Sequence, residues 1–94
     1  MYFKEGDLVY ATGGQGAASE LIGFISKLFL SDDTDYVDIQ VIHMIKEGTS
    51  ASLHVVGQTG GKYRNQVDDE HLIKIPPRYK TLQEQLRFAS LSRL

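Results

Sequence analysis

Apolar and polar residues alternate most clearly between Tyr36 and Ile45, which is the spacing of a β-strand with one buried face. The side chains expected to point inward are Val37, Ile39, Val41, His43 and Ile45. Because the other members of this face are apolar, we interpret His43 as a hydrogen-bonded core residue. The segment therefore predicts a long, half-buried strand.

Four shorter segments carry weaker strand patterns, at residues 7–11, 50–56, 62–67 and 72–75. Glycine-containing turns at residues 46–49 and 58–61 separate some of them. Pro76 and Pro77 end the last strand, because proline has no N–H to donate to a neighbouring strand. These patterns predict a twisted antiparallel sheet of four or five short strands.

The period of the apolar residues changes between residues 17 and 29. The apolar positions follow the helical i, i+3, i+4 rule: Ala18, Leu21, Ile22, Ile25, Leu28 and Phe29. Interpreted as a strand, the same residues give no alternation. The spacing predicts a helix inserted after the first strand, which Gly23 weakens by about 1 kcal/mol relative to alanine. A polar, acidic turn at residues 31–35 would end it.

A second helix is predicted at residues 82–93, because Thr81 and Glu84 have the spacing of a capping box. A helical projection places its apolar residues in two groups, Leu82, Leu86 and Ala89 on one side and Phe88, Leu91 and Leu94 on the other. A small globule covers one such stripe. Either the second stripe contacts a partner, or the helix frays after Ala89.

Composition narrows the class of protein. The chain has 94 residues, 41% hydrophobic and 23% charged, which is typical of one globular domain. The absence of cysteine excludes disulfides, thiolate zinc sites and thiol nucleophiles. No apolar run approaches the ~20 residues of a membrane helix, and the N-terminus lacks the pattern of a secretory signal. We expect a cytoplasmic protein without membrane contact.

Charge is distributed unevenly along the chain. Residues 1–47 contain three lysines and eight acidic residues, whereas residues 48–94 contain seven basic and four acidic residues. The basic C-terminal tail either packs against the acidic half, is simply solvated, or meets an acidic or phosphate-bearing partner. The cations that would form an anion or nucleic-acid patch are Lys62, Arg64, Lys74 and Arg78. The net charge of −2 makes nucleic acid the less favoured partner.

Candidate chemistry is sparse. His43 and His54 are expected on opposite faces, and His71 among residues 68–70 does not supply the four ligands of a structural zinc site. The glycine-rich residues 13–16 lack the ending of a phosphate-binding loop, so a connector is favoured over an anion site or the centre of a small-substrate enzyme. No serine lies in a nucleophile elbow. We expect no metal, no cofactor and no enzymatic activity.

The first of two family resemblances covers residues 6–57. Gly6-Asp7-Leu8-Val9, a glycine-rich stretch, residues 21–25 and then Tyr36-Val37-Asp38-Ile39 resemble the first half of permuted NlpC-type papain-like hydrolases. The catalytic histidine of that family would fall at Asp38, and no cysteine is present to act as nucleophile. The resemblance implies a degenerate hydrolase fold without the activity.

The second resemblance is to SH3-like small barrels, including KOW-type modules. Residues 5–9 open like these barrels, and residues 67–75 followed by Pro76 and Pro77 close like them. This resemblance implies a strand, rather than a helix, at residues 21–30. Such barrels are mostly binding modules, and some occur in phage connectors and ribosome-associated proteins.

Together these patterns predict an α+β domain, a small twisted antiparallel sheet or partly open SH3-like barrel with one inserted helix and a C-terminal helix. Residues 1–79 would form the core and residues 80–94 the helix that packs on the core or on a partner. The predicted function is a non-catalytic interaction or assembly module that self-associates or docks on a protein. Its expected interaction residues are Phe88, Leu91, Leu94 and Arg87. A nucleic-acid-associated barrel is the alternative.

Overall fold

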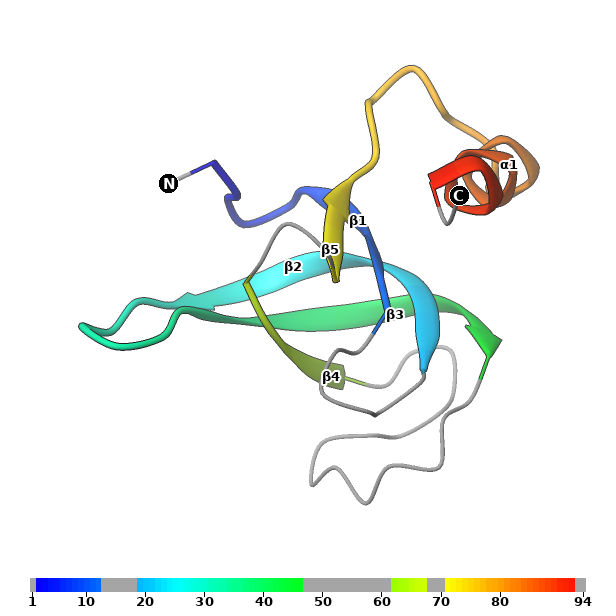
Figure 1. Cartoon of the computed structure of the whole chain (residues 1–94). Helices are drawn as coiled ribbons and strands as arrows, with labels where there is room; N and C mark the ends of the chain where they lie inside the picture. Colours follow the sequence, from blue (N-terminus) through cyan, green and yellow to red (C-terminus); the bar gives the residue numbers. More distant parts are fainter. Residues whose placement is uncertain (1, 13–18, 47–61, 68–70, 93–94) are drawn as a thin grey trace.

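A twisted antiparallel sheet and one C-terminal helix make up the computed structural model, which describes residues 2–12, 19–46, 62–67 and 71–92. The strands and the helix follow one another along the chain as shown in Figure 1. Their bounds are β1 (Leu8–Ala11), β2 (Glu20–Phe29), β3 (Tyr36–Lys46), β4 (Lys62–Gln66), β5 (Leu72–Lys74) and α1 (Leu82–Ser92). The predicted α+β class is confirmed.

The strands lie in the order β4-β3-β2-β1-β5, so the last strand returns to pair with the first. In that pairing Val9 is opposite Lys74, and the amide of Ile75 donates to the carbonyl of Leu8 over 2.8 Å. The two edge strands are linked through the side-chain amide of Asn65, which donates to the carbonyl of His71 over 3.4 Å. The sheet is therefore strongly curled.

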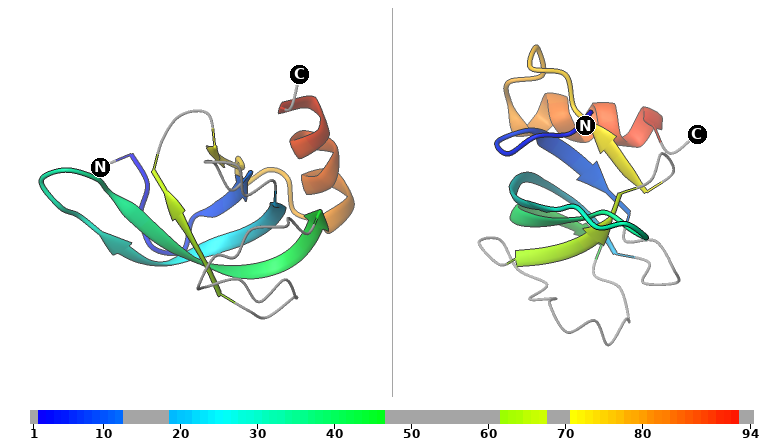
Figure 2. Two further views of the ribbon diagram at one scale, coloured as in Figure 1. Left: turned by 60° about the horizontal axis from the view of Figure 1, so that its bottom comes forward. Right: turned by 90° about the vertical axis from the view of Figure 1, so that its left-hand side faces the viewer.

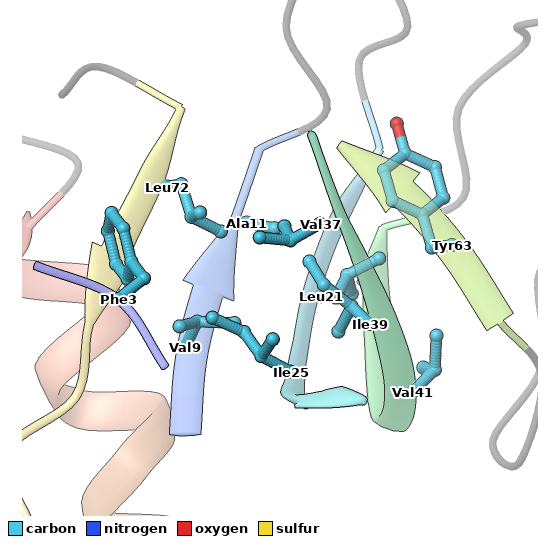
Figure 3. Packing of buried hydrophobic residues seen from close by; sticks show 10 residues of the cluster. All are labelled: Phe3, Val9, Ala11, Leu21, Ile25, Val37, Ile39, Val41, Tyr63 and Leu72. Carbon is cyan, nitrogen blue, oxygen red and sulfur yellow. The ribbon is translucent and has the colours of Figure 1, made fainter. Parts of the chain in front are cut away.

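The inner face of the curled sheet encloses the main core (Figure 3). We call this set the inner cluster, and it comprises Phe3, Val9, Ala11, Leu21, Ile25, Val37, Ile39, Val41, Tyr63 and Leu72. All five strands contribute to it, and each member is at most 6% exposed. Burial raises the pKa of the Tyr63 hydroxyl, although a hydrogen bond with Ser19 works in the opposite direction.

A second, smaller core lies on the outer face of the sheet, where α1 covers it. We call it the outer cluster. Its buried members are Tyr10, Ile22, Ile75 and Ala89, and the half-buried residues packed against them are Leu8, Ile45, Ile73, Tyr79, Leu86 and Phe88. Figure 2 shows α1 on one side of the sheet. The helix is thus attached to the core through one face.

The predicted inserted helix is wrong, because residues 20–29 form β2. Leu21 and Ile25 belong to the inner cluster, while Ile22 between them belongs to the outer cluster. A strand that is buried on both faces lacks the alternation of a half-buried strand. The strand implied at residues 21–30 by the resemblance to SH3-like barrels agrees with the structure.

Irregular register explains why the pattern imitated a helix. Ile25 pairs with Ile39 and Lys27 with Asp38, so Ser26 is an extra residue that shifts the following side chains to the other face. A similar shift on β3 lies at Ile42, since Ile22 pairs with His43 and Gly23 with Val41. The predicted inward orientation is confirmed for Val37, Ile39 and Val41. It is wrong beyond the shift, where Ile45 joins the outer cluster and His43 is only half-buried.

The C-terminal helix is confirmed, and so is its capping box. The amide of Glu84 donates to the Thr81 hydroxyl, and the amide of Thr81 donates to the Glu84 carboxylate, each over 3.1 Å. Two N–H groups at the helix start are thereby satisfied. Within the part of the chain that the structure describes, no helix is long and apolar enough to cross a membrane.

Several predictions concern positions outside the described residues. They are the strand at 50–56, the turns at 46–49 and 58–61 for the most part, the glycine-rich loop at 13–16, His54 and Leu94. The strands at residues 7–11, 36–45, 62–67 and 72–75 are confirmed, with ends that differ by a residue or two.

Candidate functional site

The inward face of α1 includes Phe88, contrary to the prediction that this ring points to a partner. Its ring lies 5.0 Å from that of Tyr79, and both belong to the outer cluster. Gln85 is buried beside them and donates its side-chain amide to the carbonyl of Tyr79 over 3.0 Å. The buried face therefore runs through Gln85 and Ala89 and takes residues from both apolar groups of the helical projection, Leu86 and Ala89 from one and Phe88 from the other.

The outward face of α1 carries two of the four predicted interaction residues. Leu91 is 64% exposed, and Arg87 and Glu84 are exposed on the same side, at helical spacings of three and four residues. The helix continues to Ser92, so it does not end after Ala89 as the fraying alternative expected. We call Glu84, Arg87 and Leu91 the outer stripe.

A shallow pocket adjoins the outer stripe at the start of the helix. It has a volume of about 230 Å³ and is lined by Tyr79, Gln83, Glu84 and Arg87. The guanidinium of Arg78 lies 5.0 Å from the centre of the Tyr79 ring, which itself forms part of the pocket lining. Ligand pockets usually exceed about 300 Å³. This one is suited to a single side chain of a partner.

The carboxylate in this pocket is committed to the helix cap. Hydrogen bonds from the backbone and the hydroxyl of Thr81 lower the pKa of Glu84 below its ordinary value. Glu84 therefore stays ionised at neutral pH, with Oε1 accepting hydrogen bonds from the amide and the hydroxyl of Thr81. Arg87 lines the pocket and Arg78 lies beside Tyr79, so these two cations are the groups near the pocket to which an incoming anion could bind.

Arg64 of the predicted basic patch is engaged within its own sheet. Its Nε lies 2.9 Å from a carboxylate oxygen of Asp38, the residue opposite it on β3. This pairing is the first cause of the raised pKa of Arg64. The guanidinium also lies over the ring of Phe29, 4.3 Å from its centre.

Lys74 is engaged in a similar way at the other edge strand. Its amino group lies 3.2 Å from a carboxylate oxygen of Asp7 and donates to the carbonyl of Tyr2 over 2.8 Å. The side chain of Lys62 lies outside the described residues. Arg78 is exposed and lies beside Tyr79, a residue of the pocket lining.

The β2–β3 hairpin carries a feature that the sequence patterns missed. Leu30 is 64% exposed at its tip, directly before the exposed carboxylates Asp32 and Asp33. The sequence pattern predicted only a polar turn at residues 31–35. The available signal was an apolar residue that no pattern accounted for, although a single exposed leucine is common on protein surfaces.

Two further observations bear on the class of site. Among the described residues, no three histidine or acidic side chains come together in a way that could hold a metal ion. Comparisons with family models, curated proteins and solved structures give no match to this chain. The candidate site therefore depends on the geometry of α1 and its surroundings.

Proposed function

We propose that this chain is a non-catalytic interaction module that binds protein through the outer stripe of α1 and the adjoining pocket. The observation that carries the proposal is the 64% exposure of Leu91 on a helix whose opposite face is fixed to the sheet. A single exposed leucine is common on protein surfaces, and what distinguishes Leu91 is its place on the outer stripe with Arg87, which also lines the pocket.

The way α1 is held supports this role. The capping box orders its first turn, the bond from Gln85 to Tyr79 ties its middle to the preceding loop, and the Phe88 ring packs on Tyr79. These contacts fix the backbone before any partner arrives, so less conformational entropy is lost on binding.

The resemblance to SH3-like barrels gives separate support. The β2 strand and a last strand that returns to β1 agree with what this resemblance implies, and such barrels are mostly binding modules. The resemblance to papain-like hydrolases points away from catalysis, because Asp38 stands where that family has its histidine and forms an ion pair with Arg64.

The expected affinity is modest. Phe88 already uses much of its apolar surface against Tyr79, so the surface available to a partner is smaller than the two-stripe pattern suggested. Small contact areas belong to weak or transient complexes. The nucleic-acid alternative has less support, since Arg64 and Lys74 already pair with Asp38 and Asp7.

The substitution Leu91→Ser tests the proposal, with Leu82→Ser as the matched control. Both leucines are exposed on α1, at 64% and 40%, but Leu82 lies off the outer stripe. Sedimentation of the full chain at high micromolar concentration should show an association that Leu91→Ser abolishes and Leu82→Ser retains. Equal association of Leu91→Ser and the wild type would exclude the outer stripe as the binding surface.

A further inference from the structure

The two ends of the molecule carry surfaces of opposite charge. The hairpin tip at residues 30–35 contains three aspartates and no cation. The segment at residues 78–91 contains Arg78, Lys80 and Arg87 against the single carboxylate of Glu84. Each end also exposes a leucine, Leu30 or Leu91, to the same extent of 64%.

These surfaces cannot meet within one chain. Figures 1 and 2 show the β2–β3 hairpin projecting from the sheet on the side away from α1. The tip is closed by its own turn, in which the amide of Thr34 donates to the Ser31 hydroxyl over 3.0 Å. It is also anchored to the sheet, because the amide of Val67 donates to the carbonyl of Asp35 over 2.9 Å.

We infer that the hairpin tip of one copy docks on the outer stripe and pocket of α1 in a second copy. This inference rests on the proposed function and names its partner as another molecule of this chain. Leu30 would contact the pocket wall formed by Tyr79, and the carboxylates of Asp32 and Asp33 would pair with Arg78 and Arg87. Charge-assisted pairs of guanidinium and carboxylate are among the stronger polar contacts.

The pocket size agrees with this occupant better than with a small molecule. A volume of about 230 Å³ lies below that of usual ligand pockets and accepts one aliphatic side chain. The tip is preorganised by the hydrogen bonds of its turn. Both partners therefore bring ordered backbone to the contact, which limits the entropy lost on association.

The resulting contact joins different surfaces of two identical chains. Such heterologous contacts produce rings or open filaments, depending on whether the rotation between neighbours closes. A symmetric dimer through two α1 helices would instead bring Arg87 of one copy near Arg87 of the other. The charge distribution favours the head-to-tail arrangement.

The test combines two variants that each remove one surface. The tip variant carries Leu30→Ser, Asp32→Asn and Asp33→Asn, and the helix variant carries Arg87→Gln and Leu91→Ser. We expect the wild type to form species larger than two chains at high micromolar concentration in low salt. Each variant alone should have the mass of one chain, and an equimolar mixture should give a species of two chains and no more, because one intact tip meets one intact helix.

Each other outcome is informative. If the tip variant associates by itself and the helix variant does not associate, the head-to-tail arrangement is wrong and the proposed function stands. If the helix variant associates by itself, both the head-to-tail arrangement and the proposed function are wrong. A wild type that stays monomeric, or a mixture of variants that does not form the two-chain species, would overturn the inference. Salt near 1 M should shift the wild type toward monomers, because the Debye length falls to about 3 Å.

Discussion

The inner and outer clusters differ in what holds them together. The inner cluster takes side chains from all five strands and is closed by the curled sheet, without any residue of α1. The outer cluster has four buried members, and half of the six half-buried residues packed against them are supplied by the helix and the loop before it. A buried glutamine, Gln85, lies on its helical side.

This difference assigns different tasks to the two regions. The sheet with its inner cluster is expected to supply most of the stability, because hydrophobic stabilisation increases with buried apolar area. The helix is held by fewer contacts, and in the proposed function its second face contacts a partner. Substitutions in the two clusters should therefore separate stability from association.

Removing side-chain volume from the inner cluster should have the largest effect. Ile39 is fully buried, so Ile39→Ala should lower the free energy of unfolding by about 2–5 kcal/mol. Phe88 is half-buried in the outer cluster, and Phe88→Ala should cost about 1–2 kcal/mol, less than a fully buried ring. Denaturant unfolding measures both. Equal costs would contradict the distinction between the clusters.

A side chain added at Gly23 should disturb the sheet where two strands approach closely. A Cβ there would overlap the carbonyl oxygen of Gln40 and the Cγ2 methyl of Ile39, both on β3. Gly23→Ala should lower the stability by about 1–3 kcal/mol through overpacking. The thermal midpoint of Gly23→Ala should fall. Gly6→Ala instead tests the cost of a positive φ of 91°, because Gly6 lies in a turn with open space around it. An unchanged midpoint for Gly23→Ala would contradict the register of β2 and β3.

The helix cap should give the smallest effect, and one that depends on pH. Thr81→Ala should cost about 1 kcal/mol by removing a cap. Because the folded pKa of Glu84 is depressed, its contribution is present above the unfolded pKa and is lost as the pH falls through the folded value. Glu84→Gln should remove this part of the acid dependence in pH-dependent melting curves. An acid dependence identical to that of the wild type would contradict the role of the ionised carboxylate.

How far the sequence predicted these regions depends on how local their signals are. The start of α1 was predictable because Thr81 and Glu84 form their contacts within one turn. The nature of residues 20–29 was not, since it depends on the shift at Ser26 and on burial of both strand faces. These features arise from contacts with β3 and α1, which no window of the sequence contains.

Only part of the interaction surface was predicted, because its geometry also depends on contacts between segments that are far apart in the sequence. A helical projection orders side chains around an axis but does not say where the sheet lies. Phe88 was assigned outward, whereas the sheet and Tyr79 cover it, and the polar Gln85 is buried because the carbonyl of Tyr79 accepts its hydrogen bond. Leu91 is exposed, as the projection required of its second stripe, and Arg87 is exposed as well.

Sedimentation equilibrium of the full chain over a wide concentration range tests the central claim most directly. We expect an average mass that rises with concentration for the wild type and stays at that of one chain for Leu91→Ser, with the same unfolding midpoint for both. A Leu91→Ser protein that associates as the wild type does would contradict the assignment of the outer face of α1 as the binding surface.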